Sequence, residues 1–360
     1  MKSGFTRDKS LMLKGVGILL MMWHHCFYKG RFENYYVVFS PLTIGQATRI
    51  AGFCKICVTM FVFVSGYGLY QIYKNKSQIV GAGRWIIHRY LKGFLPFWFI
   101  YLLSFVSCAL IDGRTWTVYF KDHIVNGFVY VFLDFLGLAK LFGSPSLSGT
   151  WWYMSAYFQY IVLFPLLFCI IEKYGSLFLV AIVLIFPRIA KFEPGGKHMY
   201  SFLLSIVLGM VFKKELIFEK IDAFTEKRNN KILIVTGLTL LSAFLYKASV
   251  LLPNKLFYDV IWDIFPMVFI VLFYLVIPYL HLTQKFLKLI GIHSANIFML
   301  HTFLLYNYLS DFIYGREHFI LIMLTLLALS LMLSYCVEGL KKLVRFPVLV
   351  KKIDAYFAIN

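Results

Sequence analysis

The sequence predicts an all-α polytopic membrane protein, a bundle of about ten transmembrane helices with one additional re-entrant or interfacial segment. Hydrophobic residues make up 60% of the chain, and the mean hydropathy is +0.75. Apolar stretches recur from residue 11 to residue 337. The longest polar stretch, residues 213–231, is too short to bury a core of its own. We therefore expect a single integral-membrane domain over residues 1–360.

The number of spans follows from the apolar segments and the basic loops between them. Eleven segments are apolar, near residues 11–28, 53–73, 94–111, 126–141, 151–172, 175–190, 199–212, 232–251, 259–280, 291–308 and 319–337. Both chain ends and the loops 74–92 and 213–231 are basic, so the positive-inside rule places them in the cytoplasm. Five segments lie between those loops, where an even number must cross. The segment 126–141 is short and contains Asp134, so we expect ten spans without it.

The net charge of +19 belongs to these short clusters. Basic clusters between apolar spans are typical of loops that face anionic lipid in a cell membrane, so we expect lipid contact and no nucleic-acid partner. Cys54 and Cys57 have the spacing of a metal-binding pair, but no second pair accompanies them. We therefore interpret both as packing residues and expect no metal site.

A histidine and a lysine share one face of the first apolar segment. Eleven residues at ~100° each bring His25 to within ~20° of Lys14, about 16 Å along the helix axis, whereas His24 points away. A neutral imidazole can accept a proton from a hydroxyl near pH 7, and a cation on one side of it can hold a phosphate. This pattern indicates acyl transfer within the membrane. The alternative is a pair of interfacial histidines that reach water at the outer end of the helix.

The basic segment before the third span predicts a second cationic feature. Arg84, His88 and Lys92 recur every four residues, so in a helix they form one stripe with Arg89 beside it. A planar guanidinium and a point-like ammonium both suit a polyphosphate ligand at the cytoplasmic mouth. The alternative is that these residues only determine topology.

Two further segments interrupt apolar runs with polar or small residues. Ser65 and Gly66 lie in the second span, where small residues allow close helix packing. Near the carboxyl end, Ser294 and His301 follow Gly291 in a helix that runs outward in the same sense as the first. We expect His301 and His25 to lie at similar depth.

Together these motifs resemble the membrane acyltransferase family called acyltransferase family three. Five motifs occur in the family's order: Lys14 to His25 is similar to its arginine-(ten residues)-histidine signature; Phe63 to Tyr67, to its FLSGF-type motif; His88 to Pro96, to its RRxxR-to-proline segment; Trp152 to Pro165, to its WxLS…Q…P helix; and Ser294 to His301, to its SYxIYLxH helix. They span residues 14 to 301. Three positions depart from the family pattern: Lys14 replaces arginine, Tyr157 stands where a subset has glutamate, and Ala295 replaces tyrosine.

The resemblance implies an enzyme that moves an acyl group, usually acetyl from cytoplasmic acetyl-CoA, to a hydroxyl of a glycan or another acceptor outside. It implies His25 as the catalytic base or transient acyl carrier. It also implies phosphate binding by Lys14, Arg89 and Lys92. Envelope-polysaccharide assembly proteins are the partners it suggests. The residues expected to shape the passage or position the acyl group are Ser65, Trp152, Ser294 and His301.

Two other functions are consistent with the same spans and basic loops. A transporter or flippase for a lipid-linked glycan would use the cations to bind pyrophosphate, but it leaves His25 and His301 without a proton-transfer role unless it is proton-coupled. No internal repeat is evident, which counts against a transporter built from symmetric halves. A sensor or assembly subunit that keeps the fold without the chemistry is the third alternative.

Overall fold

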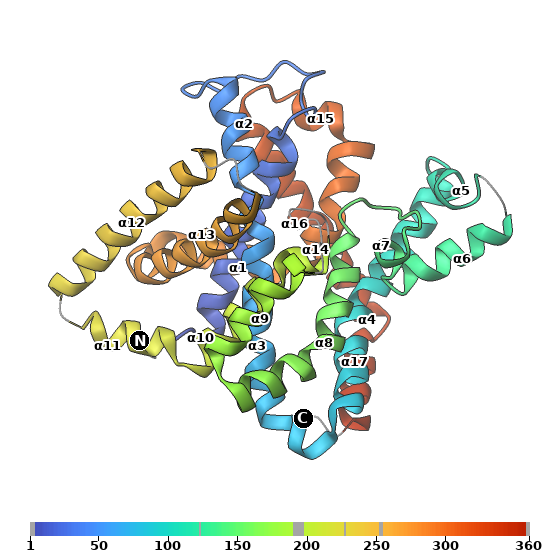
Figure 1. The fold of residues 1–360 in the computed structure, drawn as a ribbon. Helices are drawn as coiled ribbons and strands as arrows, with labels where there is room; N and C mark the ends of the chain where they lie inside the picture. The colour runs from blue at the N-terminus through green and yellow to red at the C-terminus, as the bar shows by residue number, and fades with distance from the viewer. Residues whose placement is uncertain (1–3, 122–123, 190–197, 227, 252–254, 358–360) are drawn as a thin grey trace.

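The computed structural model describes residues 4–357 except 122–123, 190–197, 227 and 252–254. In this part of the chain the regular structure is helical, and α1 and α3 run side by side through the middle of the bundle (Figure 1). The helices are α1 (Arg7–Phe27), α2 (Ile44–Phe53), α3 (Ile56–Val80), α4 (Ala82–Leu110), α5 (Arg114–Tyr119), α6 (Ile124–Phe135), α7 (Ala139–Phe142), α8 (Trp152–Tyr174), α9 (Ser176–Ile189), α10 (Leu203–Lys214), α11 (Ile217–Phe224), α12 (Arg228–Leu251), α13 (Lys255–Val276), α14 (His281–Phe303), α15 (Ser310–Tyr314), α16 (Phe319–Leu343) and α17 (Phe346–Tyr356), with the short η1 (Met199–Phe202), η2 (Ile277–Tyr279) and π-helical η3 (Leu304–Tyr308).

Six helices within the described residues are long and apolar enough to cross a membrane. They are α1, the stretch Ile44–Asn75, α4, α8, the stretch His281–Tyr308 and α16. The apolar parts of α6, α9, α12 and α13 are shorter, so the count of ten spans stays a prediction. The 12 residues of α6 extend only about 18 Å, well below the ~30 Å hydrocarbon core. This helix projects from the side of the bundle (Figure 1), as expected for a segment that does not cross.

Asp134 of α6 is a structural residue. Its buried carboxylate accepts hydrogen bonds from the Tyr119 hydroxyl and, at 3.1 Å, from the backbone N–H of Leu147. Tyr101 of α4 in turn bonds the Tyr119 hydroxyl at 3.1 Å. Asp134, the polar residue in this apolar segment, therefore connects α4, α5 and α6 to the loop before α8 by hydrogen bonds.

Two helix pairs approach closely through glycines. A Cβ on Gly15 of α1 would lie 2.2 Å from the Leu287 carbonyl oxygen, and one on Gly291 of α14 would lie 1.9 Å from that of Leu11. The same relation joins α3 to α10 through Gly66 and Gly209, whose Cβ atoms would lie 2.1 and 2.3 Å from backbone oxygens. The expected packing role of Gly66 is thus confirmed. Without side chains at these positions, the helix backbones lie in contact.

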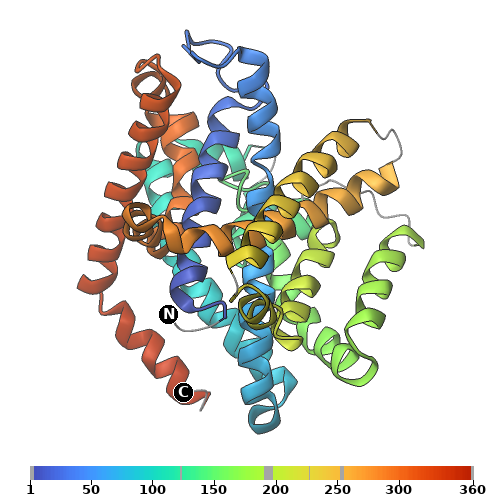
Figure 2. The ribbon, with the colours of Figure 1, turned by 90° about the vertical axis from the view of Figure 1, so that its left-hand side faces the viewer.

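The basic segments of the chain gather at one end of the bundle, which we call the basic end. The N–H of Gly4 donates to the Asp222 carboxylate of α11 at 2.8 Å, so the amino terminus lies beside the loop 213–231. Arg84 at the start of α4 donates to the carbonyl of Tyr356 at 2.9 Å, so α17 lies beside the loop 74–92. Figures 1 and 2 show both termini at this end. If an even number of helices crosses the membrane between any two of these basic segments, all of them must lie on the same side, as they do here.

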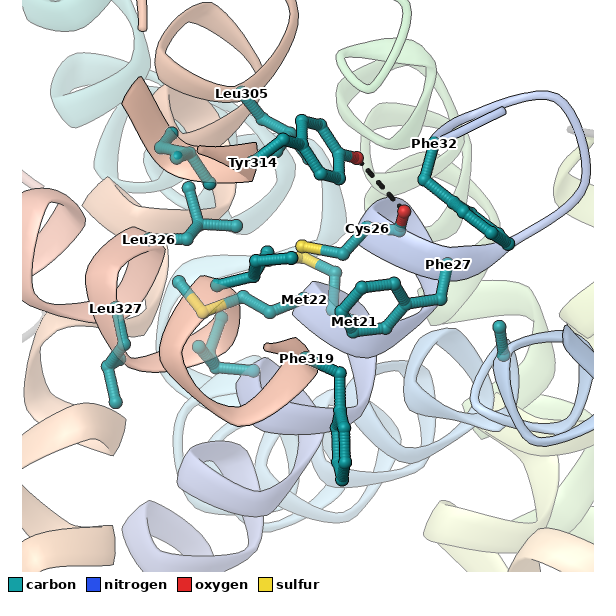
Figure 3. Packing of buried hydrophobic residues seen from close by; sticks show 14 of the residues in the cluster. Met21, Met22, Cys26, Phe27, Phe32, Leu305, Tyr314, Phe319, Leu326 and Leu327 are labelled. Carbon is teal, nitrogen blue, oxygen red and sulfur yellow. Dashed lines mark hydrogen bonds between the residues drawn. The ribbon is translucent and has the colours of Figure 1, made fainter. Parts of the chain in front are cut away.

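The opposite end carries the loop 28–43, α2 and α15 (Figure 2). Apolar side chains of the last turns of α1 pack there against α14, α15 and α16 (Figure 3). Met22, Cys26 and Phe27 are fully buried in this cluster. The cluster therefore fixes the rotation of α1 at the turn that carries His24 and His25.

Candidate active site

His25 and His301 face each other across the contact between α1 and α14. Their ring centroids are 4.9 Å apart. Gly15 of α1 and Gly291 of α14 lie at the close contact between the two helices. Each histidine follows its glycine by ten residues, so the two rings lie at the same height above this contact. α14 begins at His281 and not near residue 291, so the two histidines lie 18 and 20 residues into their helices. The expectation of similar depth is confirmed.

Hydrogen bonds determine which ring nitrogen of His25 carries the proton. The hydroxyl of Tyr306 donates to the His25 carbonyl at 2.8 Å, which uses its single proton. The same oxygen lies 3.1 Å from His25 Nδ1. Nδ1 must then be the donor in that contact, which leaves Nε2 with the lone pair. A half-buried imidazole in this tautomer can accept a proton or an acyl group at Nε2.

His301 adopts the same tautomer for a different reason. Its Nδ1 lies 3.0 Å from the carbonyl oxygens of both Ile297 and Phe298, and only a protonated nitrogen satisfies these acceptors. Nε2 of this fully buried ring has no hydrogen-bond partner among the residues that the structure describes. An unpaired polar atom in a dry interior is costly, and such atoms mark sites where a ligand or a proton completes the bonding. His301 is therefore a second candidate base beside His25.

Sequence reasoning did not identify Tyr306. It lies in η3, a π-helical segment that directly follows α14, and the wider turn places its hydroxyl on the backbone and ring of His25. Short π-helical segments recur at functional sites. The Arg31 guanidinium covers the Tyr306 ring at 4.8 Å from its centroid. No local pattern in the sequence signals this contact, because Tyr306 and His25 are 281 residues apart.

The His24 ring lies 5.2 Å from that of His25, but its hydrogen bond reaches another helix. Its Nδ1 lies 2.7 Å from the carbonyl oxygen of Ala51 in α2, and its ring stacks on Tyr28. His24 therefore joins α1 to α2.

Two cations enter the bundle without a hydrogen bond to an anionic side chain among the described residues. Lys14 is half-buried on α1, and no hydrogen bond or ion pair of its ammonium is found in the described part of the chain. The Arg89 guanidinium of α4 lies over the Trp85 ring, and its enclosed Nε lacks a hydrogen-bond partner among the described residues. Tyr157 and Asp354 are both close enough to Arg89 to interact electrostatically with it. An anionic group of a ligand would satisfy either cation.

The rest of the expected cationic stripe is covered by α17. The Asp354 carboxylate accepts hydrogen bonds from Lys92 at 2.9 Å to both oxygens and contacts His88 Nε2 at 2.8 Å. Partial burial alone would raise the pKa of Asp354, but the bonds from Lys92 and His88 outweigh it and hold the pKa below its usual value. The stripe forms as the spacing predicts, but in this structure it binds the chain's own carboxyl-terminal helix.

The three remaining expected residues contact groups other than His25 and His301. Ser65 donates to the Phe61 carbonyl of its own helix, and Ser294 donates to the Gly291 carbonyl, each at 2.8–2.9 Å. Trp152 stacks on Phe202 with ring centroids 5.8 Å apart. These contacts are structural, and a role in shaping the passage stays a prediction.

The neighbouring Trp151, which was not among the expected site residues, contacts α14. Its indole N–H donates to the Met299 carbonyl at 3.1 Å, and its ring packs 5.7 Å from that of Phe303. The hydroxyl of Ser148, in the loop before α8, lies 3.1 Å from that of Thr302. Because Trp151 and Trp152 are adjacent and identical, the sequence alone does not indicate which of them faces α14.

The fold and the site together define a helical membrane protein with paired imidazoles between two closely packed helices. Comparison with known proteins then identifies the family. The family model of the acyltransferase domain, acyltransferase family three, matches residues 12–339, and the chain belongs to this family. The protein is therefore an acyltransferase of the membrane-embedded type, with an acyl donor and a hydroxyl acceptor as its substrates. Searches of curated proteins and of solved structures found no match.

Proposed function

We propose that this protein is an O-acetyltransferase that moves acetyl from cytoplasmic acetyl-CoA to a hydroxyl of a cell-surface polysaccharide or its precursor. The observation that carries the proposal is the contact of His25 with His301, two imidazoles whose Nε2 atoms hold lone pairs. Acyl transfer to a hydroxyl needs a base that is neutral near pH 7. Family membership supplies the acyl-transfer chemistry.

In the proposed reaction the acceptor oxygen attacks the thioester carbonyl while an imidazole Nε2 takes the hydroxyl proton. The new C–O bond forms, the C–S bond breaks, and the CoA thiolate leaves and is protonated. In the second route His25 Nε2 attacks the thioester carbonyl, the C–S bond breaks and the CoA thiolate leaves. The acceptor oxygen then attacks the acetyl carbon, the N–C bond breaks, and His301 takes the hydroxyl proton as base. In both routes Tyr306 holds the His25 tautomer. A fixed ring orientation keeps the Nε2 lone pair directed at the hydroxyl proton in the first route and at the thioester carbon in the second.

The donor would enter from the basic end, which we infer to be cytoplasmic because it gathers both termini and the basic loops. Lys14 and Arg89 are the cations available to CoA phosphates, and Lys92 becomes available when Asp354 releases it. The acceptor would approach from the opposite end. This orientation in the cell membrane requires the even number of spans that the charge distribution predicts.

Turnover of labelled acetyl-CoA by purified protein in detergent tests the proposal, with a crude envelope fraction as the acceptor. We expect His25→Ala to lose most of the transfer, on the order of the 10²- to 10⁴-fold that positioned bases contribute. His24→Ala is the matched control, because it removes a neighbouring imidazole whose ring lies 5.2 Å from His25 but whose Nδ1 bonds the Ala51 carbonyl of α2. Equal loss in both variants, or a normal rate in His25→Ala, would contradict the assignment. A wild-type protein that binds lipid-linked glycan without consuming acetyl-CoA would favour the transporter.

A further inference from the structure

A cavity of about 360 Å³ opens at the end of the molecule opposite the basic end. Its floor is formed by the loop that follows α1, and one wall is formed by α2. The residues that line it are Lys29, Phe32, Glu33, Tyr35, Tyr36, Val37, Ile44 and Thr48. Tyr36 stands at the rim with 73% of its surface exposed. No residue of this cavity belongs to the site described above.

One layer of aromatic rings separates the cavity from the turn that carries His25. Tyr35 stacks on Tyr314 with ring centroids 4.5 Å apart and planes at 15°. The Tyr314 hydroxyl donates to the carbonyl of Cys26, the residue after His25, at 2.9 Å (Figure 3). Asp311 accepts from the Tyr35 hydroxyl at 2.8 Å and so fixes this ring. The cavity therefore adjoins the end of α1 that carries His25.

We infer that this cavity binds a sugar ring of the acceptor, an inference that rests on the proposed function. Its lining combines tyrosine and phenylalanine rings with a carboxylate, an ammonium and a hydroxyl, from Glu33, Lys29 and Thr48. The C–H faces of a sugar pack on aromatic rings, and its hydroxyls donate to carboxylates and accept from ammonium groups. The volume lies at the small end of the ~300–1,000 Å³ of ligand pockets. That space suits one or two sugar rings and excludes an acyl-CoA.

The position of the cavity supports the same occupant. A polysaccharide held here would present a neighbouring sugar to His25 from the side opposite the donor cations. Arg31, two residues from the cavity residues Lys29 and Glu33, covers the Tyr306 ring that bonds His25. The loop that would hold the acceptor therefore also contacts the residue that orients the imidazole.

The experiment measures binding of purified, detergent-solubilised protein to an array of defined neutral, N-acetylated and acidic oligosaccharides. We expect the wild type to bind at least one class. Loss of one aromatic contact, worth ~0.5–1.5 kcal/mol, corresponds to a decrease of about 2- to 13-fold in affinity for Tyr36→Ala. Glu33→Gln should also weaken binding. Glu317→Gln, an exposed glutamate at the same end and outside the cavity, is the matched control and should bind as the wild type does.

Four measurements distinguish the outcomes. Hydrolysis of labelled acetyl-CoA without acceptor should be unchanged in Tyr36→Ala. A wild-type protein that does not turn over acetyl-CoA would refute the proposed function, and the oligosaccharide measurements would then test the cavity independently. Absence of oligosaccharide binding, or equal binding by all variants, would overturn the inference. So would binding to anionic lipid vesicles that Tyr36→Ala abolishes, which would indicate a lipid headgroup. A change of oligomeric state in Tyr36→Ala would indicate a second copy of the chain.

Discussion

The contact between α1 and α14 makes Gly291→Ala a severe test of the proposed active site, although the residue touches neither imidazole. The added Cβ would lie 1.9 Å from the Leu11 carbonyl oxygen, whereas real Cβ contacts stay beyond 3.0 Å. Backbone cannot yield as a flexible side chain does. The two helices must therefore separate by about 1 Å at this point. His25 and His301 lie ten residues further along the two helices, about 15 Å away.

Two effects of this separation can be estimated. Overpacking of this kind costs about 1–3 kcal/mol of stability, so the unfolding temperature should fall. A displacement of reacting groups by about 1 Å can lower the rate on the order of 100-fold. Gly15→Ala should act in the same way from the other helix, because its Cβ would lie 2.2 Å from the Leu287 carbonyl oxygen. The catalytic groups themselves are unchanged in both variants.

The assay is labelled acetyl-CoA turnover by each variant at equal membrane abundance, together with thermal unfolding in detergent. Gly339→Ala is the control, because a Cβ there meets nothing within 4 Å. It should retain both the rate and the unfolding temperature of the wild type. A Gly291→Ala protein with normal rate and normal stability would refute the view that close helix approach positions the histidines.

Four more outcomes are expected. Arg89→Ala should weaken acetyl-CoA binding by about 1.5–3 kcal/mol in a direct titration. Lys92→Ala should weaken it less, because Asp354 already pairs that ammonium. Equal affinity of the wild type and Arg89→Ala would contradict the donor site. Asp354→Asn should tighten binding by releasing Lys92, and weaker binding would show that α17 supports the donor site. Because the folded-state pKa of Asp354 is lowered, the contact of its carboxylate with Lys92 and His88 should stabilise the docking of α17 above pH ~4. It should be lost only as the pH falls through that lowered pKa. The rate of protease cleavage before α17 would measure this loss. A cysteine at Glu226, in a background without other accessible cysteines, should resist an impermeant thiol reagent in intact cells and react after lysis; labelling in intact cells would place the basic end outside.

Local sequence patterns were sufficient for the features that depend on neighbouring residues along one helix. Apolar segment length predicted the helical class, and every apolar segment corresponds to a helix in the described part of the chain. The 3.6-residue period distinguished His25 from His24 before any tertiary contact was known, and the four-residue spacing predicted the stripe of Arg84, His88 and Lys92. Each of these properties follows from the geometry of a single helix.

Tertiary structure decided what those faces contact. The stripe meets Asp354, and Arg89 turns inward, because α17 docks on α4 through residues more than 260 positions away. Tyr306 reaches His25 because a π-helical segment after α14 rotates it there. The tautomer of His25 depends on this long-range contact, whereas Nδ1 of His301 contacts carbonyl oxygens three and four residues earlier in its own helix. The 3.6-residue repeat of a helix lets the sequence determine which residues share a face, but the packing of the whole bundle determines what each face contacts.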